Sequence, residues 1–118
     1  MLRSLRLSVV PCLAVALACV PACSKKSDRI KIGVVTNCTA EFWSFAEAGA
    51  NKAARDYDVD LQFRQLDKAF DASAQTPIID SWVKQGLNGI AVSVIDPQNQ
   101  TEDLTRVAKK VPLVTMDN

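Results

Sequence analysis

Residues 89–96 read GIAVSVID, a short apolar run that ends in a carboxylate. Two further runs have the same form: residues 31–37 read KIGVVTN, and residues 111–118 read VPLVTMDN. Near-continuous Val and Ile over so few residues is typical of strands that are buried on both faces of a parallel sheet. We therefore predict that these runs are strands of one parallel sheet, each followed by polar residues.

The segments between these runs have the spacing of amphipathic helices. Residues 42–57 place apolar or small side chains at helical intervals, and a stripe of Ala and Gly allows such a helix to lie close against a sheet. The buried face of this first helix is expected to comprise Phe42, Phe45, Ala46, Gly49, Ala50, Ala53, Ala54 and Tyr57. A second helix is expected to bury Ile78, Ile79, Trp82, Val83 and Leu87, and a third Leu104, Val107 and Ala108.

The ends of the second helix carry recognisable signals. Asp71 or Ser73 can cap its first turn, because both side chains accept a hydrogen bond from a free backbone N–H. Pro77 either starts the regular helix late or kinks it. Gly86 suits the left-handed position that ends a helix.

Strands and helices alternate along the whole of this region. Strands are expected at residues 29–35, 60–66, 89–95 and 113–116, the second of them more exposed, as at a sheet edge. Asn99 or Thr101 can cap the third helix. The order β-α-β-α-β-α-β with right-handed crossovers predicts an α/β fold, a doubly wound parallel sheet with helices on both faces.

The composition excludes several classes of function. The chain has 118 residues, 48% hydrophobic and 23% charged, which is typical of one folded domain. Without Arg3 and Arg6 near the N-terminus, 12 of the 14 basic residues remain against 13 acidic ones, so we expect no nucleic-acid surface. The absence of histidine removes the commonest general base and the commonest zinc ligand. We expect no enzymatic activity, no metal site and no cofactor.

The first 22 residues read as an export signal rather than as part of the fold. Arg3 and Arg6 form the positive segment, and residues 7–20 form an apolar segment too short to span a bilayer. Residues 20–23 read VPAC, which resembles the motif of bacterial lipoprotein signals, in which the cysteine is lipidated and becomes the first mature residue. We therefore divide the chain into a signal at 1–22, a polar tether at 23–28 and a domain at 29–118.

Two alternatives to lipidation at Cys23 stay open. Residues 16–19 read ALAC, which offers Cys19 as a competing lipidation site. An ordinary cleaved signal without any lipid fits the same charge and hydropathy pattern. A lipid on Cys23 would hold the domain at a membrane surface without spanning it.

Polar residues follow the predicted strands and point to a binding site. Ligands bind at the carboxyl ends of the strands in open α/β sheets, and these ends share one edge. Asn37, Asp96, Asp117 and Asn118 would come together there, although they are far apart in sequence. Residues 36–43 contain no glycine, so the phosphate-binding loop of a dinucleotide site is absent from this turn.

Adjacent aromatic residues, Phe42 and Trp43, follow the first of these loops. A flat aromatic face can stack on the C–H face of a sugar ring, whose hydroxyls bond to amides and carboxylates. Alternatively, the two rings are simply packing at the start of a helix. Asp117 and Asn118 could equally be a solvated strand end, and Asp96, which precedes a proline, a turn and helix entry.

The order and spacing of these segments resemble the amino-terminal lobe of periplasmic sugar-binding proteins, the ribose/galactose-type solute receptors of ABC importers. The resemblance covers residues 29–118, and these proteins are related to the effector domains of LacI-type repressors. It is carried by IGVV at 32–35, FW at 42–43, WVKQGLNGI at 82–90, IDP at 95–97 and VPLVTMD at 111–117. It implies a partial first lobe of a periplasmic binding protein type I fold.

The resemblance also implies roles for individual residues. Phe42 and Trp43 match the aromatic pair that sandwiches the sugar, Asp117 matches an aspartate that binds sugar hydroxyls, and Asn37 lies in the loop that lines the cleft. Asn118 stands where ribose-type receptors often carry an arginine. Residues 40–41 read AE in place of the Asn-Pro often found before the aromatic pair.

The function implied is capture of a sugar or similar small polar solute for an ABC permease in the membrane. The location implied is the periplasm or cell envelope, with membrane contact only through a lipid anchor. A similar lobe that presents sugar to a membrane sensor is the alternative. Because the family closes two lobes over its ligand and residues 29–118 account for part of the first, binding by this half-site alone is expected to be weak.

Overall fold

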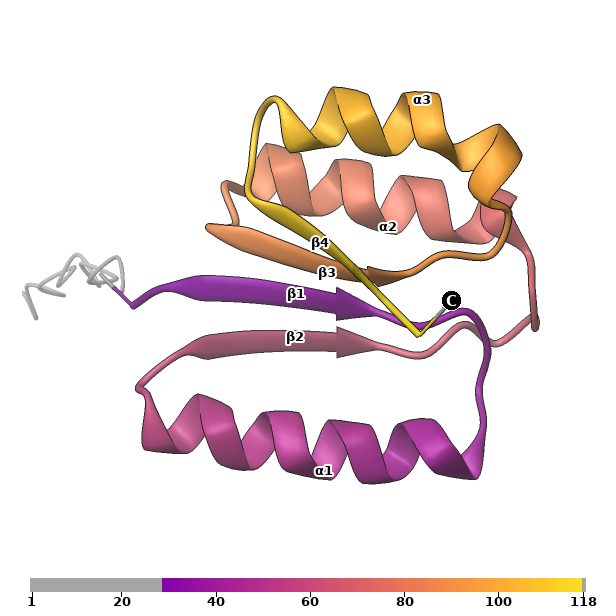
Figure 1. Cartoon of the computed structure of the whole chain (residues 1–118). Coiled ribbons are helices and arrows are strands. Elements are labelled where there is room, and N and C mark those ends of the chain that lie inside the picture. The colour runs from indigo at the N-terminus through magenta and orange to yellow at the C-terminus, as the bar shows by residue number, and fades with distance from the viewer. Residues whose placement is uncertain (1–28, 118) are drawn as a thin grey trace, which may run out of the picture.

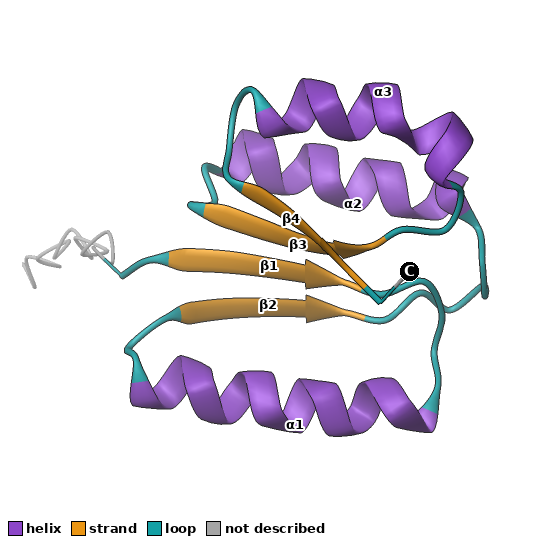
Figure 2. Ribbon diagram, viewed as in Figure 1, coloured by secondary structure: helices purple, strands orange, loops and turns teal. Residues whose placement is uncertain are grey.

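The computed structural model describes residues 29–117, so Cys23 and Asn118 lie outside the described residues. The described chain is a four-stranded parallel sheet with three helices (Figure 1, Figure 2). Its elements are β1 (Lys31–Val35), α1 (Glu41–Asp56), β2 (Asp60–Arg64), α2 (Ala72–Gln85), β3 (Gly89–Ser93), α3 (Pro97–Ala108) and β4 (Leu113–Met116).

The strand order in the sheet is β2-β1-β3-β4, and every neighbouring pair is parallel. Helix α1 covers one face of the sheet, whereas α2 and α3 lie side by side on the other face (Figure 1). This confirms the predicted doubly wound α/β fold. Because all four strands run the same way, their carboxyl ends meet at one edge, on the right of Figure 1.

The main core lies between the sheet and the pair α2 and α3. Val35, Ile90 and Val92 point from β1 and β3 into this layer and are almost fully buried. Ile79 and Trp82 of α2 meet them there. These buried side chains seat α2 firmly on the strands whose ends carry the predicted site.

The ends of α2 follow the sequence signals closely. Asp71 is the N-cap, because its Oδ1 accepts a hydrogen bond from the backbone N–H of Ser73 at 3.0 Å. Gly86 has φ of 72° and ends the helix in the left-handed conformation, as predicted. Pro77 lies inside α2, so the alternative that the regular helix starts late at this residue is wrong, and the alternative of a kink stays a prediction.

The predicted cap of α3 is also corrected. Asp96, rather than Asn99 or Thr101, is the N-cap, and its Oδ1 accepts from the backbone N–H of Asn99 at 3.1 Å. The helix begins at Pro97, because a proline fits the first helical position, where no N–H is needed. β3 ends at Ser93, two residues earlier than expected.

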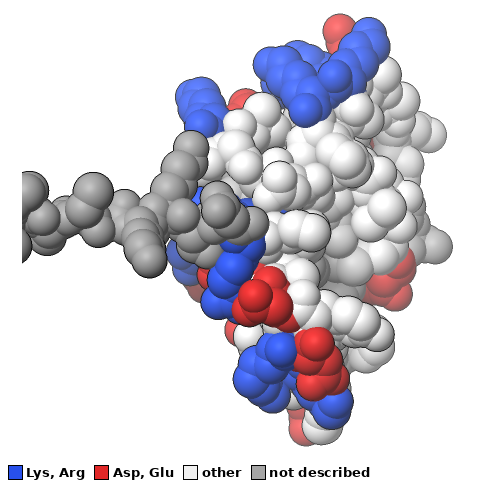
Figure 3. All heavy atoms as spheres, turned by 90° about the vertical axis from the view of Figure 1, so that its left-hand side faces the viewer, with Lys and Arg blue, Asp and Glu red and all other residues white. Residues whose placement is uncertain are grey.

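The buried face expected for α1 is largely wrong. Only Ala46, Ala50 and Ala54 of that face are half-buried, whereas Phe42, Phe45 and Tyr57 are 60%, 71% and 80% exposed. The buried residue of α1 is Trp43, which was not part of the expected face. Helix α1 packs against the edge strand β2, so one flank of its apolar stripe has no described neighbour. Seen from the amino ends of the strands, charged side chains of both signs gather over α3 and α1, with a broad uncharged surface between them (Figure 3).

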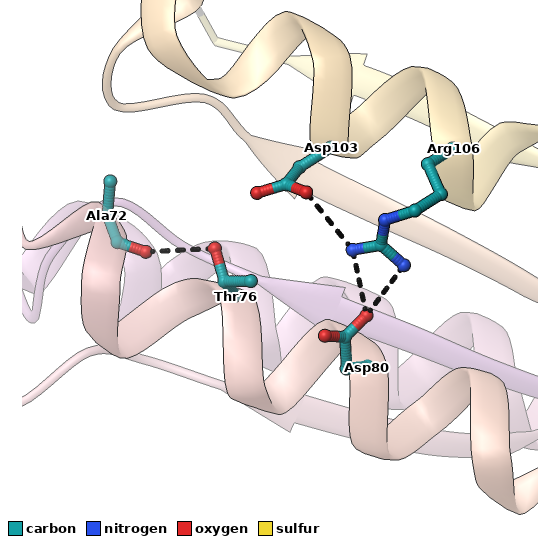
Figure 4. A network of polar contacts seen from close by, with 5 residues as sticks. All are labelled: Ala72, Thr76, Asp80, Asp103 and Arg106. Carbon is teal, nitrogen blue, oxygen red and sulfur yellow. Dashed lines mark hydrogen bonds and ion pairs between the residues drawn. The ribbon is translucent and has the colours of Figure 1, made fainter.

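Helices α2 and α3 are joined by an ion-pair network (Figure 4). The guanidinium of Arg106 donates to Asp80 and Asp103 at 3.2 Å, and these two carboxylates raise the pKa of Arg106. Within α2, Thr76 Oγ1 donates to the carbonyl of Ala72 at 3.3 Å. Because exposed ion pairs contribute little stability, the buried apolar side chains of the core, rather than this network, hold α3 against α2.

Candidate functional site

The loop after β1 is fastened to the end of β2. The backbone N–H of Thr36 donates to the carbonyl of Arg64 at 3.0 Å, and Thr39 Oγ1 donates to the carbonyl of Leu66 at 2.8 Å. Thr36 is fully buried, and its Oγ1 donates to the carbonyl of Cys38 at 2.6 Å. Asn37, between these anchors, is therefore held at the carboxyl edge.

The side chain of Asn37 has a defined orientation. Trp43 Nε1 donates to Asn37 Oδ1 at 3.0 Å. The amide oxygen therefore faces the start of α1, and the amide NH₂ group is turned away from it. A neighbouring ligand would meet Asn37 as a hydrogen-bond donor.

Phe42 and Trp43 have different environments. Phe42 is 60% exposed, whereas Trp43 is 4% exposed. Their ring centroids are 5.0 Å apart and their planes meet at 73°, so the edge of one ring contacts the face of the other. The indole is buried and bonded to Asn37, and it supports the exposed ring of Phe42, while contact of either ring with a ligand stays a prediction.

A third aromatic residue at this edge, Phe70, was not predicted from the sequence. Its backbone N–H donates to the carbonyl of Asn37 at 2.8 Å, and its side chain is 66% exposed. Its φ is 56°, a left-handed conformation that is costly for a bulky residue. No periodic pattern marks a lone aromatic between a strand and a helix, so no local sequence signal could have identified it.

Two buried glutamines, also missed, lie behind the loops. Gln75 of α2 donates through Nε2 to the carbonyls of Thr36 at 3.1 Å and Ser93 at 2.9 Å. Gln100 of α3 donates through Nε2 to Gln75 Oε1 at 2.7 Å. Because Gln75 is one turn before the buried Ile79 of the same helix, a polar side chain on the apolar face was the signal that could have revealed it.

Asp96 is engaged in capping α3. Besides the bond to the backbone of Asn99, its Oδ2 accepts from Asn99 Nδ2 at 2.6 Å. These bonds from Asn99 lower the pKa of Asp96 below its usual value. The structure thus gives Asp96 a definite structural role, and contact with a ligand stays a prediction.

Asp117 directly follows β4 and is exposed, with φ of 52°. Because β3 alone separates β4 from β1 in the sheet, the end of β4 is about 10 Å from the end of β1. Two side chains across such a gap can both reach one small ligand. Asn37, Phe42 at the start of α1 and Asp117 are therefore the candidate contacts at this edge, and their contact with a ligand stays a prediction; Asn118 is outside the described residues.

A groove of about 650 Å³ lies between the edge strand β2 and α2, and none of the sequence-predicted site residues lines it. Among residues 29–117, no group of three or more His, Cys, Asp or Glu side chains could hold a metal ion. No helix in the same range has the length and apolar character needed to cross a membrane.

Comparison with known proteins identifies the class. The family model described as "Periplasmic binding protein domain" matches residues 32–118, and the chain therefore belongs to the periplasmic binding protein family. The fold and the polar edge described above are consistent with that membership. Among curated proteins, no sequence matches the chain.

Solved structures of periplasmic solute-binding proteins share the fold of this chain. The chain is similar to a periplasmic sugar-binding protein of an ABC sugar transporter from Legionella pneumophila, with 28% identity, a TM-score of 0.70, and coverage of 76% of this chain and 34% of that chain. An ABC transporter solute-binding protein from Burkholderia graminis in complex with D-arabinose is 25% identical, with a TM-score of 0.69 and coverage of 75% and 30%.

A third structure shares the fold. LsrB from Clostridium saccharobutylicum, in complex with AI-2, is 24% identical, with a TM-score of 0.68 and coverage of 75% of this chain and 27% of that chain. The chain therefore spans about a third of the length of the solved structures it matches.

Proposed function

We propose that this chain is part of the first lobe of an exported receptor that captures a sugar or a similar small polar solute for an ABC importer. The proposed activity is reversible binding without a chemical step. The observation that carries the proposal is the exposed ring of Phe42, supported by Trp43, beside the oriented amide of Asn37 at the carboxyl edge of the sheet.

The chemistry of this edge suits a sugar. The C–H face of a pyranose or furanose ring can stack on Phe42, and the NH₂ group of Asn37 can donate to a hydroxyl oxygen. The carboxylate of Asp117 can accept from two neighbouring hydroxyls at once. Asn118 would add an amide beside it. Apolar stacking with a few directed polar groups is the usual composition of a small-molecule site.

The ligands named for similar proteins support a small sugar as the ligand of this chain. The Burkholderia graminis protein was solved with D-arabinose, and the Legionella pneumophila protein is described as sugar-binding. We propose a neutral pentose or hexose for this chain on that basis. Because the described lobe covers one face of a ligand, we expect a dissociation constant near 1 mM, equivalent to about −4 kcal/mol.

A titration of the isotope-labelled chain followed by nuclear magnetic resonance tests the proposal. D-arabinose, D-ribose and D-galactose are added to about 50 mM, well above the expected dissociation constant. We expect shifts of the backbone amides of Asn37, Phe42 and Asp117. Absence of any shift with all of these sugars, while the chain is folded, would contradict the proposal.

Substitution of two phenylalanines makes the test specific. Phe42→Ala removes the proposed stacking surface, whereas Phe45→Ala, one turn further along α1, removes a ring that is slightly more exposed. We expect Phe42→Ala to weaken binding about 5-fold to 10-fold, as for loss of one aromatic contact, and Phe45→Ala to leave it unchanged. If the two variants change the dissociation constant equally, Phe42 has no specific role in the site.

The location is part of the same proposal. We place the receptor at the cell envelope, with a lipid on Cys23 and an ABC permease as its membrane partner. The support is the sequence of residues 20–23 and the membership of the family. Cys23→Ser is expected to abolish incorporation of labelled fatty acid and to move the protein from the membrane to the soluble fraction. If Cys23→Ser leaves incorporation of the labelled fatty acid unchanged and Cys19→Ser abolishes it, the lipidated residue is Cys19.

A further inference from the structure

We infer that Gln75 and Gln100 are positioning residues of the ligand site, which hold the loops after β1 and β3 at a fixed separation. The inference rests on the proposed function, since it concerns the geometry of that same edge. Neither residue touches the proposed ligand. Each acts through the backbone that carries Asn37 or Asp96.

The backbone ladder stops where the pair begins. β1 and β3 are paired from Ile32 and Gly89 up to Val35 and Val92. The next carbonyls along the two strands, those of Thr36 and Ser93, both accept from Gln75 Nε2, at 3.1 and 2.9 Å. One side-chain amide thus joins the two strands just beyond their last backbone pair. Asn37 is the next residue after this joint.

Gln100 extends the same connection to the loop after β3. Its Oε1 accepts from the backbone N–H groups of Ile95 at 2.9 Å and Asp96 at 2.8 Å, while its Nε2 donates to Gln75 Oε1 at 2.7 Å. The chain of bonds therefore runs without interruption from the residue before Asn37 to Asp96. It crosses from α2 to α3, the helices that the ion pairs of Arg106 also join.

The pair is both buried and directional. Gln75 is 0% exposed and Gln100 is 5% exposed, so water cannot replace their hydrogen bonds. Gln75 Nε2 donates both of its hydrogens to carbonyl oxygens, and Gln75 Oε1 accepts a hydrogen bond from Gln100 Nε2. Rotation of either amide by half a turn would place donors against donors, so each side chain has a single orientation.

An apolar side chain of similar length removes the connection without adding charge. Gln75→Met leaves the carbonyls of Thr36 and Ser93 without this partner, and Gln100→Met frees the N–H groups of Ile95 and Asp96. Gln85→Met is the matched control, because Gln85 also lies on α2 and bonds to a glutamine, Gln62, but on the exposed surface near β2.

The experiment measures sugar binding of the full chain by the same titration, at a temperature where circular dichroism shows each variant to be folded. We expect Gln75→Met and Gln100→Met to raise the dissociation constant about 10-fold or more and Gln85→Met to leave it unchanged. We also expect displaced signals and faster hydrogen exchange at the amides of Asn37 and Asp96 before any sugar is added, a local signature that general destabilisation would not give.

The possible results distinguish failure of the positioning role from failure of the proposed sugar-binding function. If the wild-type chain binds sugar and a folded Gln75→Met variant binds it equally well with unshifted amides, positioning by the pair is refuted and the proposed function stands. Should Gln75→Met fail to fold, Gln100→Met, with a less buried side chain, is judged by the same criteria. If the folded wild-type chain binds no sugar, the proposed function falls and this inference falls with it.

Discussion

Gly33→Ala is expected to destabilise the protein, because there is no room for a methyl group between β1 and α2. A Cβ atom at this position would lie 2.5 Å from Trp82 Cε3 and 2.8 Å from both Cδ2 and Cζ3. Carbon atoms in contact are normally about 3.5 to 4 Å apart. The indole is not free to move aside, since it is 2% exposed and its Nε1 donates to Gln62 Oε1 at 2.7 Å.

The size of the effect follows from this geometry. Forcing an extra carbon into a well-packed core typically costs about 1–3 kcal/mol. In a domain of this size, each 1 kcal/mol lowers the melting temperature by roughly 4–8 °C. We therefore expect Gly33→Ala to melt at least about 4 °C below the wild type.

Gly49→Ala is the matched control for the same chemical change. A Cβ at position 49, in α1, would meet nothing within 4 Å. Alanine in place of glycine inside a helix stabilises it by about 0.5–1 kcal/mol. The midpoints of thermal and urea unfolding, followed by circular dichroism, should therefore fall for Gly33→Ala and rise for Gly49→Ala. A melting temperature of Gly33→Ala at or above that of the wild type would refute the tight packing of Trp82 on β1.

Two further predictions concern individual hydrogen bonds. Hydrogen bonds from Ser73 and Lys68 lower the pKa of Asp71 from 3.8 to about 2, so this carboxylate stabilises the fold above pH 4 and the contribution is lost as the pH falls towards 2. In acid unfolding curves, Asp71→Asn should show a shallower loss of stability over that interval, and parallel curves would contradict the role of the cap. Trp43→Phe keeps a ring but removes the N–H that orients Asn37; sugar binding measured by titration should weaken about 2-fold to 10-fold, and unchanged binding would show that Asn37 needs no such support.

Much of the fold could be predicted because each signal was local. Apolar runs, helical spacing and the left-handed glycine at position 86 each identify an element from a few residues. The predicted ends of the strands were less accurate, because the end of a strand depends on its pairing with neighbouring strands in the sheet. β3 stops at Ser93, where Gln75 takes over the carbonyl that a ladder bond would otherwise use. That contact joins residues 18 positions apart, and no local pattern encodes it.

The place of the candidate residues at one edge of the sheet could be predicted for a similar reason. Asn37 and Phe42 follow a strand end, so topology alone brings them to the edge. The different environments of Phe42 and Trp43 could not be deduced, since consecutive helical residues point about 100° apart and the sequence does not say which one faces inward. Phe70 reaches the edge through a left-handed turn of its own backbone, which propensity does not favour in a bulky residue.

The hydrogen-bond polarity of the edge argues for a neutral ligand. The oxygen of Asn37 is occupied by Trp43, so this side offers a donor, while Asp117 across the edge offers only acceptors when ionised. A sugar hydroxyl can both accept and donate, so a neutral sugar satisfies both sides. A uronic acid keeps the sugar ring but adds a second carboxylate, which we expect Asp117 to repel. In the titration, D-galactose should therefore bind more tightly than D-galacturonate, and Asp117→Asn should narrow the difference in affinity; tighter binding of the acid would show that a cationic group, rather than Asn37 and Asp117, selects the ligand.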